Sequence, residues 1–200
     1  VLHLDIQPWS IDELGELINE FDNVKILLDM NPNKSNLIKR FEKYITKYNF
    51  WGLKLHPRLN NFNLLNEKVL KLVNVAGRLN KPVIVDCFPD GNSLINNFNP
   101  SDYGILSNHC KNTNIIASHM GGHFVIDMML IAKRCQNLYL NLAYTLLYYR
   151  GSSVVQDLIY CINSIKSKKI FYGSDYPDRE FLETINFTKK EFKKFKLKKT

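Results

Sequence analysis

Short apolar runs alternate with longer amphipathic segments along almost the whole of this 200-residue chain. Each run has the length and composition of a β-strand, and the segments between them have helical periodicity. Strict alternation of strands and helices is typical of parallel βαβ units, and strands that are apolar almost throughout are expected when both faces of the sheet are covered. The expected strands are Val1–Ile6, Val24–Asp29, Trp51–His56, Pro82–Cys87, Asn114–His119, Leu138–Leu142 and Lys169–Gly173.

The expected helices lie between these strands. Ser10-Ile-Asp-Glu13 has the form of a capping box and opens the first helix. The stretches Arg58–Asn66 and Phe88–Ser101 are the longest irregular ones, and because each follows a strand we expect both to be βα loops. The other expected helices are Leu37–Lys47, Glu67–Leu79, Tyr103–Cys110, Phe124–Cys135 and Val154–Ser167.

This order of elements predicts an α/β fold, a (β/α)8 TIM barrel whose first strand is missing from the chain. The prediction is a single barrel domain over residues 1–200, with a Lys-rich C-terminal tail over residues 189–200. An open doubly wound sheet is the alternative. The barrel is preferred because no strand is followed by the G-x-G-x-x-G turn of a dinucleotide-binding sheet. In a barrel, the βα loops carry the active site.

Composition narrows the class of protein. A hydrophobic content of 45% is enough for a real core, and no apolar run approaches the ~20 residues that cross a bilayer. The sequence shows no secretory signal pattern, so we expect a cytoplasmic protein with free thiols. Four widely spaced cysteines form no C-x-x-C pair, which argues against a zinc ribbon or a redox motif: Cys87, Cys110, Cys135 and Cys161.

Most of the net positive charge lies at one end of the chain. The segment Lys189–Thr200 holds seven lysines and one glutamate and so contributes +6 of the net charge of +8. A basic tail of this kind can touch nucleic acid or an acidic surface. A solvated terminal helix with an apolar edge at Phe192 and Phe195 is the commoner case, so nucleic-acid binding is ranked last.

Two strand ends carry side chains suited to catalysis. The run Ile170–Tyr172 stops at Gly173-Ser-Asp175, and the following Pro177 prevents its continuation. Similarly, Asn114–His119 ends in a histidine that meets a Gly-rich turn. At strand ends, His119 and Asp175 predict a metal or acid/base site. A hydrogen-bonded core histidine is the alternative for His119.

Further polar residues end two other strands. Lys54 and His56 share one face of their strand, and burying an unpaired charge is costly. They therefore predict contact with a substrate carboxylate or phosphate, or else a Lys54–carboxylate pair and a loop cap at His56. Asp86 follows four apolar residues. It either faces the mouth of the barrel or caps the loop after it.

Four stretches together resemble the amidohydrolase superfamily, most closely its amidohydrolase-2 group of metal-dependent hydrolases and non-oxidative decarboxylases. They occur in the family's order from residue 24 to the C-terminus: Gly52–Pro57, Ile115–Gly122, Asn137–Asn141 and Phe171–Pro177. The resemblance implies a (β/α)8 barrel with a metal at the carboxyl ends of its strands. It makes His119 the strand-six histidine and Asp175 the strand-eight aspartate.

The chain departs from the family pattern at two places. Asp86 stands at the strand-five position where the family usually has histidine, although a carboxylate also binds zinc or manganese. The family's His-x-His strand is absent, because Val1–Ile6 counts as strand two by position. The metal ligands that the resemblance implies are thus Asp175, His119 and Asp86, with one divalent ion, zinc or else manganese.

The resemblance implies a metal-dependent hydrolase of a small molecule, with Asp175 and His119 as catalytic residues. Asp175 takes the proton of a metal-bound water, and His119 orients the substrate or stabilises the developing oxyanion. Lys54, His56 and Arg58 are the expected substrate-binding residues. The alternatives are a non-oxidative decarboxylase and a catalytically degenerate barrel that acts as a binding protein. Relatives are commonly dimers, so a homodimer is expected.

Overall fold

The computed structural model describes residues 9–48, 50–165 and 167–195. It divides into two compact units, each with its own core. Unit 1 comprises residues 1–86 and 105–116, and unit 2 comprises residues 87–104 and 117–200. The expected strand Val1–Ile6 lies outside the described residues. Nothing in the structure tests the prediction of a single domain, which stays a prediction.

A parallel sheet with flanking helices is the framework of the described chain, as the alternation of elements predicts. Its strands are hydrogen-bonded to their neighbours in the order in which they follow along the chain, β1 to β6. Every expected strand within the described residues is confirmed, although each is shorter than predicted. The observed bounds are β1 Leu27–Asp29, β2 Gly52–Leu55, β3 Val83–Val85, β4 Ile115–Ala117, β5 Leu138–Asn141 and β6 Ile170–Phe171.

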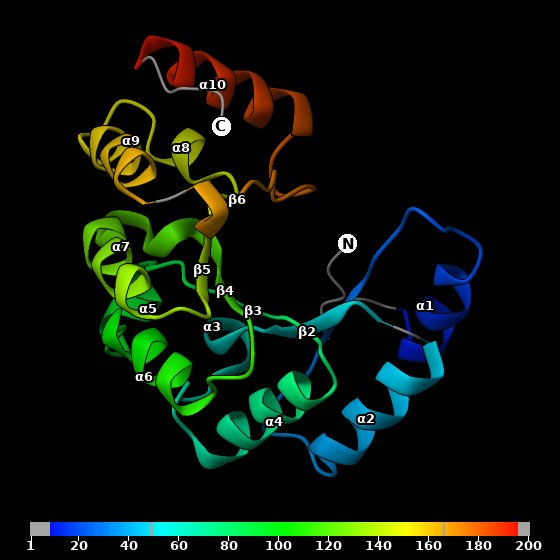
Figure 1. Cartoon of the computed structure of the whole chain (residues 1–200). Coiled ribbons are helices and arrows are strands. Elements are labelled where there is room, and N and C mark those ends of the chain that lie inside the picture. The colour runs from blue at the N-terminus through cyan, green and yellow to red at the C-terminus, as the bar shows by residue number, and fades with distance from the viewer. Residues whose placement is uncertain (1–8, 49, 166, 196–200) are drawn as a thin grey trace. The chain divides into compact units, whose positions relative to one another are not determined.

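In unit 1, β2 lies between β1 and β3. Leu27 is in register with Gly52, and Leu53 with Val83. The amide of Val83 donates to the carbonyl of Asn114 at 2.9 Å, so the residue that precedes β4 lies beside the start of β3. Helices α2 (Leu37–Tyr48) and α4 (Glu67–Arg78) pack against each other in this unit, and α1 (Ile11–Ile18) packs on α2 (Figure 1).

In unit 2, β5 pairs with β6 through the register Leu140 to Ile170. The turn after β4 is the 3₁₀ segment η1 (Ser118–Phe124), which contacts both β5 and α7 (Val125–Arg134). Helix α7 also packs against α9 (Val154–Ser164), and α8 (Thr145–Tyr148) packs against α10 (Phe181–Lys194) (Figure 1). Unit 2 also holds α5 (Gly91–Ile95) and η2 (Ser167–Lys169), while α6 (Ser101–His109) crosses the boundary between the units.

The two stretches expected to be irregular loops contain short helices, so that prediction is wrong in part. Helix α3 (Pro57–Asn60) starts with proline at its first position, and α5 starts after Asp90, whose Oδ1 accepts the amide of Ser93 at 2.8 Å. Both start signals are typical of helices. One-turn helices are too short to show a 3.6-residue repeat, so the periodicity of the sequence does not reveal them.

The capping box at Ser10 is confirmed. The Ser10 hydroxyl accepts the amide of Glu13, and the Glu13 carboxylate accepts the amide of Ser10. The four cysteines are free, as predicted, and all four are buried. No helix among the described residues has both the length and the apolar character needed to cross a membrane.

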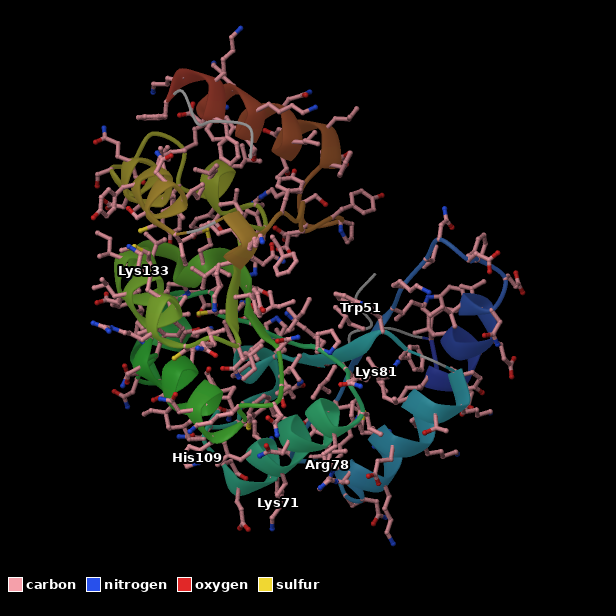
Figure 2. The ribbon with its side chains drawn as sticks, in the orientation of Figure 1. Trp51, Lys71, Arg78, Lys81, His109 and Lys133 are labelled. Atoms are coloured by element: carbon pink, nitrogen blue, oxygen red, sulfur yellow. The ribbon has the colours of Figure 1, made fainter. Side chains whose placement is uncertain are left out.

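Two exposed basic side chains of unit 1 have acidic partners close by. Lys71 and Arg78, labelled in Figure 2, project from α4. The Lys71 ammonium lies 2.6 Å from the Glu67 carboxylate, and the Arg78 guanidinium lies 4.0 Å from that of Glu42. Such pairs are typical of a solvated helix surface.

Candidate active site

The polar residues predicted on β2 are buried at its carboxyl end. Lys54 is 2% exposed and His56 is 7% exposed. The register sets Lys54 opposite Asp29 of β1, which is itself 4% exposed. Residues in register on parallel strands point to the same face, so a buried ammonium has an acidic neighbour across the strands. Asp29, which also ends an apolar strand, was not singled out from the sequence.

Asp86 follows β3 and faces two residues of the β2 exit. Its Oδ1 lies 3.6 Å from His56 Nε2, and the Nε–H of Arg58 donates to its Oδ2 at 3.4 Å. The Asp86 side chain is only 4% exposed, whereas that of Arg58 is 29% exposed. One carboxylate therefore contacts both an imidazole and a guanidinium. We name Lys54, His56, Arg58 and Asp86 the charged cluster.

His56 also begins helix α3. Its Nδ1 accepts the amide of Leu59 at 3.4 Å, so the loop-cap alternative drawn from the sequence is confirmed. Because Nδ1 accepts, a neutral His56 ring carries its proton on Nε2, the nitrogen that faces Asp86. The cap thereby sets which ring nitrogen meets the carboxylate. The helix start and the position of Asp86 depend on the same side chain.

His119 lies among aromatic rings in unit 2 and is 5% exposed. Its ring meets those of Phe88 and Tyr144 edge to face, with centroids 5.3 and 5.4 Å apart. Phe88 in turn contacts Tyr148 at 4.8 Å and Tyr149 at 6.5 Å. Edge-to-face packing of this kind holds rings in defined orientations. We name these five residues, Phe88, His119, Tyr144, Tyr148 and Tyr149, the aromatic cluster.

The backbone around the aromatic cluster adopts the left-handed conformation at four residues other than glycine and asparagine. Of the described non-glycine residues with positive φ, all but four are asparagines, and these four follow strands of unit 2: His119 (61°), Met120 (52°), Ala143 (46°) and Asp175 (61°). For a residue with a Cβ this conformation costs roughly 1–2 kcal/mol. Such costs concentrate at functional sites.

The Gly-rich turn after His119 has a steric reason for its glycines. Gly121 and Gly122 also have positive φ. A Cβ on Gly122 would lie 2.6 Å from Cδ of Pro89 and 2.8 Å from the hydroxyl of Tyr149. The chain therefore passes closely between these two side chains, which only glycine allows.

Asp175 follows β6 at a turn and is half-buried. Its carbonyl accepts the amide of Asp178 at 2.9 Å, and the Ser174 hydroxyl accepts the amide of Tyr176 at 3.3 Å. The Arg179 guanidinium lies over the Tyr144 ring, 5.6 Å from its centroid. Ser174 thus makes a local turn contact, whereas Arg179 contacts a ring of the aromatic cluster.

Electrostatics ties Asp175 to the aromatic cluster. Burial raises the pKa of Tyr144 above its ordinary value, and the carboxylates of Asp178 and Asp175 raise it further. Burial likewise raises the pKa of Tyr149. Both hydroxyls therefore stay protonated at neutral pH and remain donors. The His119 ring packs on Tyr144, and the Asp175 carboxylate acts on the same phenol electrostatically. The spacing of residues along the sequence does not reveal this connection.

The donor types expected for a metal are present, but they do not assemble into a complete site. Imidazole nitrogen and carboxylate oxygen suit zinc or manganese. Within the described ranges, however, no three His, Cys, Asp or Glu side chains form a group that could hold an ion. Asp86, moreover, has a guanidinium beside it. The described residues alone therefore do not complete a metal site.

Comparison with known proteins supports the class that the sheet and its strand-end residues define. An uncharacterised TIM-barrel protein from Bordetella bronchiseptica aligns with a TM-score of 0.76 at 16% identity, over 90% of this chain and 64% of that chain. A probable 2-pyrone-4,6-dicarboxylic acid hydrolase from Acinetobacter baumannii, with citric acid bound, gives a TM-score of 0.66 at 12% identity, over 95% and 74%. These likenesses show an α/β fold of the TIM-barrel kind.

A third structure adds a different enzyme with the same fold. A 5-carboxyvanillate decarboxylase from Novosphingobium aromaticivorans, with manganese bound, gives a TM-score of 0.59 at 12% identity, over 88% of this chain and 62% of that chain. This chain thus spans less than two thirds of the length of some of the proteins that it matches. A search of curated proteins found no match.

The amidohydrolase family model matches residues 3–193. The chain therefore belongs to the amidohydrolase family, as the four sequence stretches indicate. Its structural neighbours include both a hydrolase and a decarboxylase.

Proposed function

We propose that this chain is a hydrolase acting on a small molecule that carries a carboxylate. The observation that carries the proposal is the pair of strand-end residues in unit 2. His119 and Asp175 are both in the left-handed conformation, the His119 ring packs on Tyr144, and Arg179 from the turn after Asp175 lies over the same ring. Unusual backbone conformations at polar residues that follow strands cluster at active sites.

The proposed roles follow from the two side chains. Asp175 is half-buried and, when ionised, accepts the proton of an attacking water and passes it to the leaving group. His119 is held by Phe88 and Tyr144, so its ring cannot turn freely. A held imidazole suits the orientation of a substrate carbonyl or the stabilisation of its oxyanion.

The charged cluster supports the proposed substrate class. Lys54, His56 and Arg58 are proposed to bind the substrate, because ammonium and guanidinium groups are the usual partners of carboxylates. Arg58 is the most exposed of the three and has Asp86 on its Nε. A guanidinium can meet a carboxylate through two parallel hydrogen bonds, which suits this role.

Metal dependence is part of the proposal, because the chain belongs to a metal-dependent family and a neighbour holds manganese. Zinc is the first expectation and manganese the second, with Asp175, His119 and Asp86 as candidate ligands. A bound metal would lower the pKa of water. Since the described residues do not complete a site, we assign no step to it. Elemental analysis of the purified protein measures its presence.

A decarboxylase is the second candidate, favoured by the fold likeness to the 5-carboxyvanillate decarboxylase. It predicts release of carbon dioxide from a carboxylated ring, without ring opening. The third candidate is a catalytically degenerate barrel that only binds its ligand. It is favoured by Asp86, which lies in an ion pair at the position where relatives have a histidine.

The test is a panel of carboxylated lactones and amides, with hydrolysis followed by acid release and decarboxylation by carbon dioxide release. We expect Asp175→Asn to lower turnover about a thousandfold, the range of a lost general base. The control Asp127→Asn changes an exposed carboxylate of α7 in the same unit and should leave turnover unchanged. Equal turnover in wild type and the Asp175→Asn variant would refute the assignment.

A further inference from the structure

Tyr144 contacts the side chains of a histidine and an arginine. Its ring meets the His119 imidazole edge to face, at 5.4 Å between centroids and an interplanar angle of 77°. The Arg179 guanidinium lies over the same ring at 5.6 Å. Tyr144 is itself only 8% exposed. A buried ring between a strand-end histidine and an arginine restrains both of them.

The backbone places Tyr144 through a turn that costs conformational energy. Ala143 has a φ of 46°, and its amide donates to Oδ1 of Asn141 at 2.8 Å. The Thr145 amide donates to the carbonyl of Leu142 at 3.1 Å. A side-chain amide and a closed turn therefore hold an alanine in a conformation that it rarely adopts.

The exit of β6 supports the same turn. The Leu142 amide donates to the carbonyl of Phe171 at 2.8 Å. A Cβ on Gly173 would lie 3.1 Å from Oδ1 of Asn141, so the chain leading to Asp175 passes closely by Asn141. The position of Tyr144 is thus linked to the chain that carries Asp175 and Arg179.

The charge around Tyr144 is consistent with a neutral, electron-rich ring. Burial raises its pKa, and the Asp178 and Asp175 carboxylates act in the same direction. A neutral phenol adds no negative charge beside these carboxylates, and its ring face attracts a guanidinium. Arg179 also lies 3.6 Å from the Asp178 carboxylate, with its side chain 47% exposed. The outer edge of Arg179 therefore remains accessible to a solute.

We propose that Tyr144 is a positioning residue, whose ring holds the His119 imidazole in place and directs the Arg179 guanidinium toward a substrate carboxylate. This inference rests on the proposed function for its substrate class. It assigns the role to the ring rather than to the hydroxyl. It also makes Arg179 a binding residue of unit 2, separate from the charged cluster of unit 1.

Three variants of the full chain separate this role from general packing. Tyr144→Leu removes the ring, and Tyr144→Phe keeps it. Tyr148→Leu is the matched control, because Tyr148 is in the same cluster and makes ring contacts with Phe88, Tyr144 and Tyr149. Neither His119 nor Arg179 is among those contacts. Circular dichroism verifies that each variant folds.

The first measurement needs no substrate. Diethyl pyrocarbonate modifies exposed imidazoles, and peptide mass spectrometry follows its reaction at His119. We expect Tyr144→Leu to raise the rate at least about fivefold, because the ring that covers the imidazole is gone. Tyr144→Phe and Tyr148→Leu should stay within about twofold of wild type. Equal rates in the two leucine variants would overturn the inference.

The second measurement uses citrate as a carboxylate probe, followed by calorimetry. We expect Tyr144→Leu to weaken citrate binding about tenfold and Tyr144→Phe to restore it. Arg179→Gln should weaken binding as much as Tyr144→Leu. If Tyr144→Leu binds citrate like wild type, the directing role is wrong. If wild type binds no citrate, the proposed substrate class fails, while the His119 modification rates still decide whether Tyr144 holds the imidazole.

Discussion

The charged cluster and the aromatic cluster are both built at the carboxyl ends of strands, but different forces hold them. In the charged cluster, His56 and Arg58 contact the two oxygens of one carboxylate, that of Asp86. In the aromatic cluster, ring-to-ring packing surrounds His119. A buried ion pair depends on its geometry and hydrogen bonds, and packed rings depend on close contact. We propose that the first cluster binds substrate and that the second positions the reacting groups.

The two units also differ in which residue types adopt positive φ. The three positive-φ residues of unit 1 other than glycine are Asn36, Asn61 and Asn80 within the described segments, and asparagine accepts this conformation readily. In unit 2, histidine, methionine, alanine and aspartate adopt it after the strands. Within the described segments, positive φ at residues other than glycine and asparagine therefore occurs in the unit that holds the proposed catalytic residues.

The largest effect expected on stability comes from removing the central ring of the aromatic cluster. Phe88 is 6% exposed and contacts His119 and three tyrosines. Phe88→Ala should lower the free energy of unfolding by about 3–5 kcal/mol, because it leaves a cavity. Urea denaturation measures it. Tyr148→Ala, at a half-exposed ring, should cost much less, and equal losses would mean that packing does not dominate this cluster.

Removing the central charge of the other cluster should have the next largest effect. Asp86→Asn keeps the shape of the side chain but removes the negative charge that faces Arg58 and His56. We expect the free energy of unfolding to fall by about 2–4 kcal/mol, slightly less than for a fully buried pair because Arg58 is partly exposed. The exposed Asp127→Asn is the control. A loss no larger than in that control would show that the ion pair contributes little.

The strain in unit 2 can be tested by a substitution that relieves it. Ala143→Gly should raise the free energy of unfolding by about 0.5–1 kcal/mol, because glycine accepts positive φ without steric cost. The same change at Ala117, a fully buried residue of β4, should be destabilising. If both variants lose stability in thermal melts, Ala143 stores no strain.

The smallest effect concerns an exposed ion pair of unit 1. The Lys47 ammonium, with the Tyr48 hydroxyl, lowers the pKa of Asp12 from 3.8 to about 2. A carboxyl group whose pKa is lower in the folded state stabilises the fold at pH values above its unfolded-state pKa. That stabilisation is lost as the pH falls toward 2. The wild type should therefore lose slightly more stability than Asp12→Asn between pH about 4 and about 2, measured by urea unfolding. Parallel acid curves would argue against the pair.

The sequence predicts the described strands and the long helices between them, because burial on both sides and helical periodicity leave clear patterns. It anticipates helix α10 (Phe181–Lys194) only in its last residues. It also places His119 and Asp175 at strand ends. It does not reveal that Asp86 contacts both His56 and Arg58, since that depends on which neighbouring strand the chain pairs with. The sequence also does not reveal the contacts of Tyr144, because the left-handed turn that places it is at Ala143, and alanine does not mark such a turn.

We propose a hydrolase that recognises a carboxylate, and one measurement tests both parts together. Turnover of carboxylated lactones is compared with that of their uncharged methyl esters, using base consumption at constant pH. We expect hydrolysis of at least one acid, with kcat/KM about a hundredfold above that of its ester, as expected when charged hydrogen bonds are lost. Equal rates for acid and ester, or no hydrolysis of either, would contradict the proposed function.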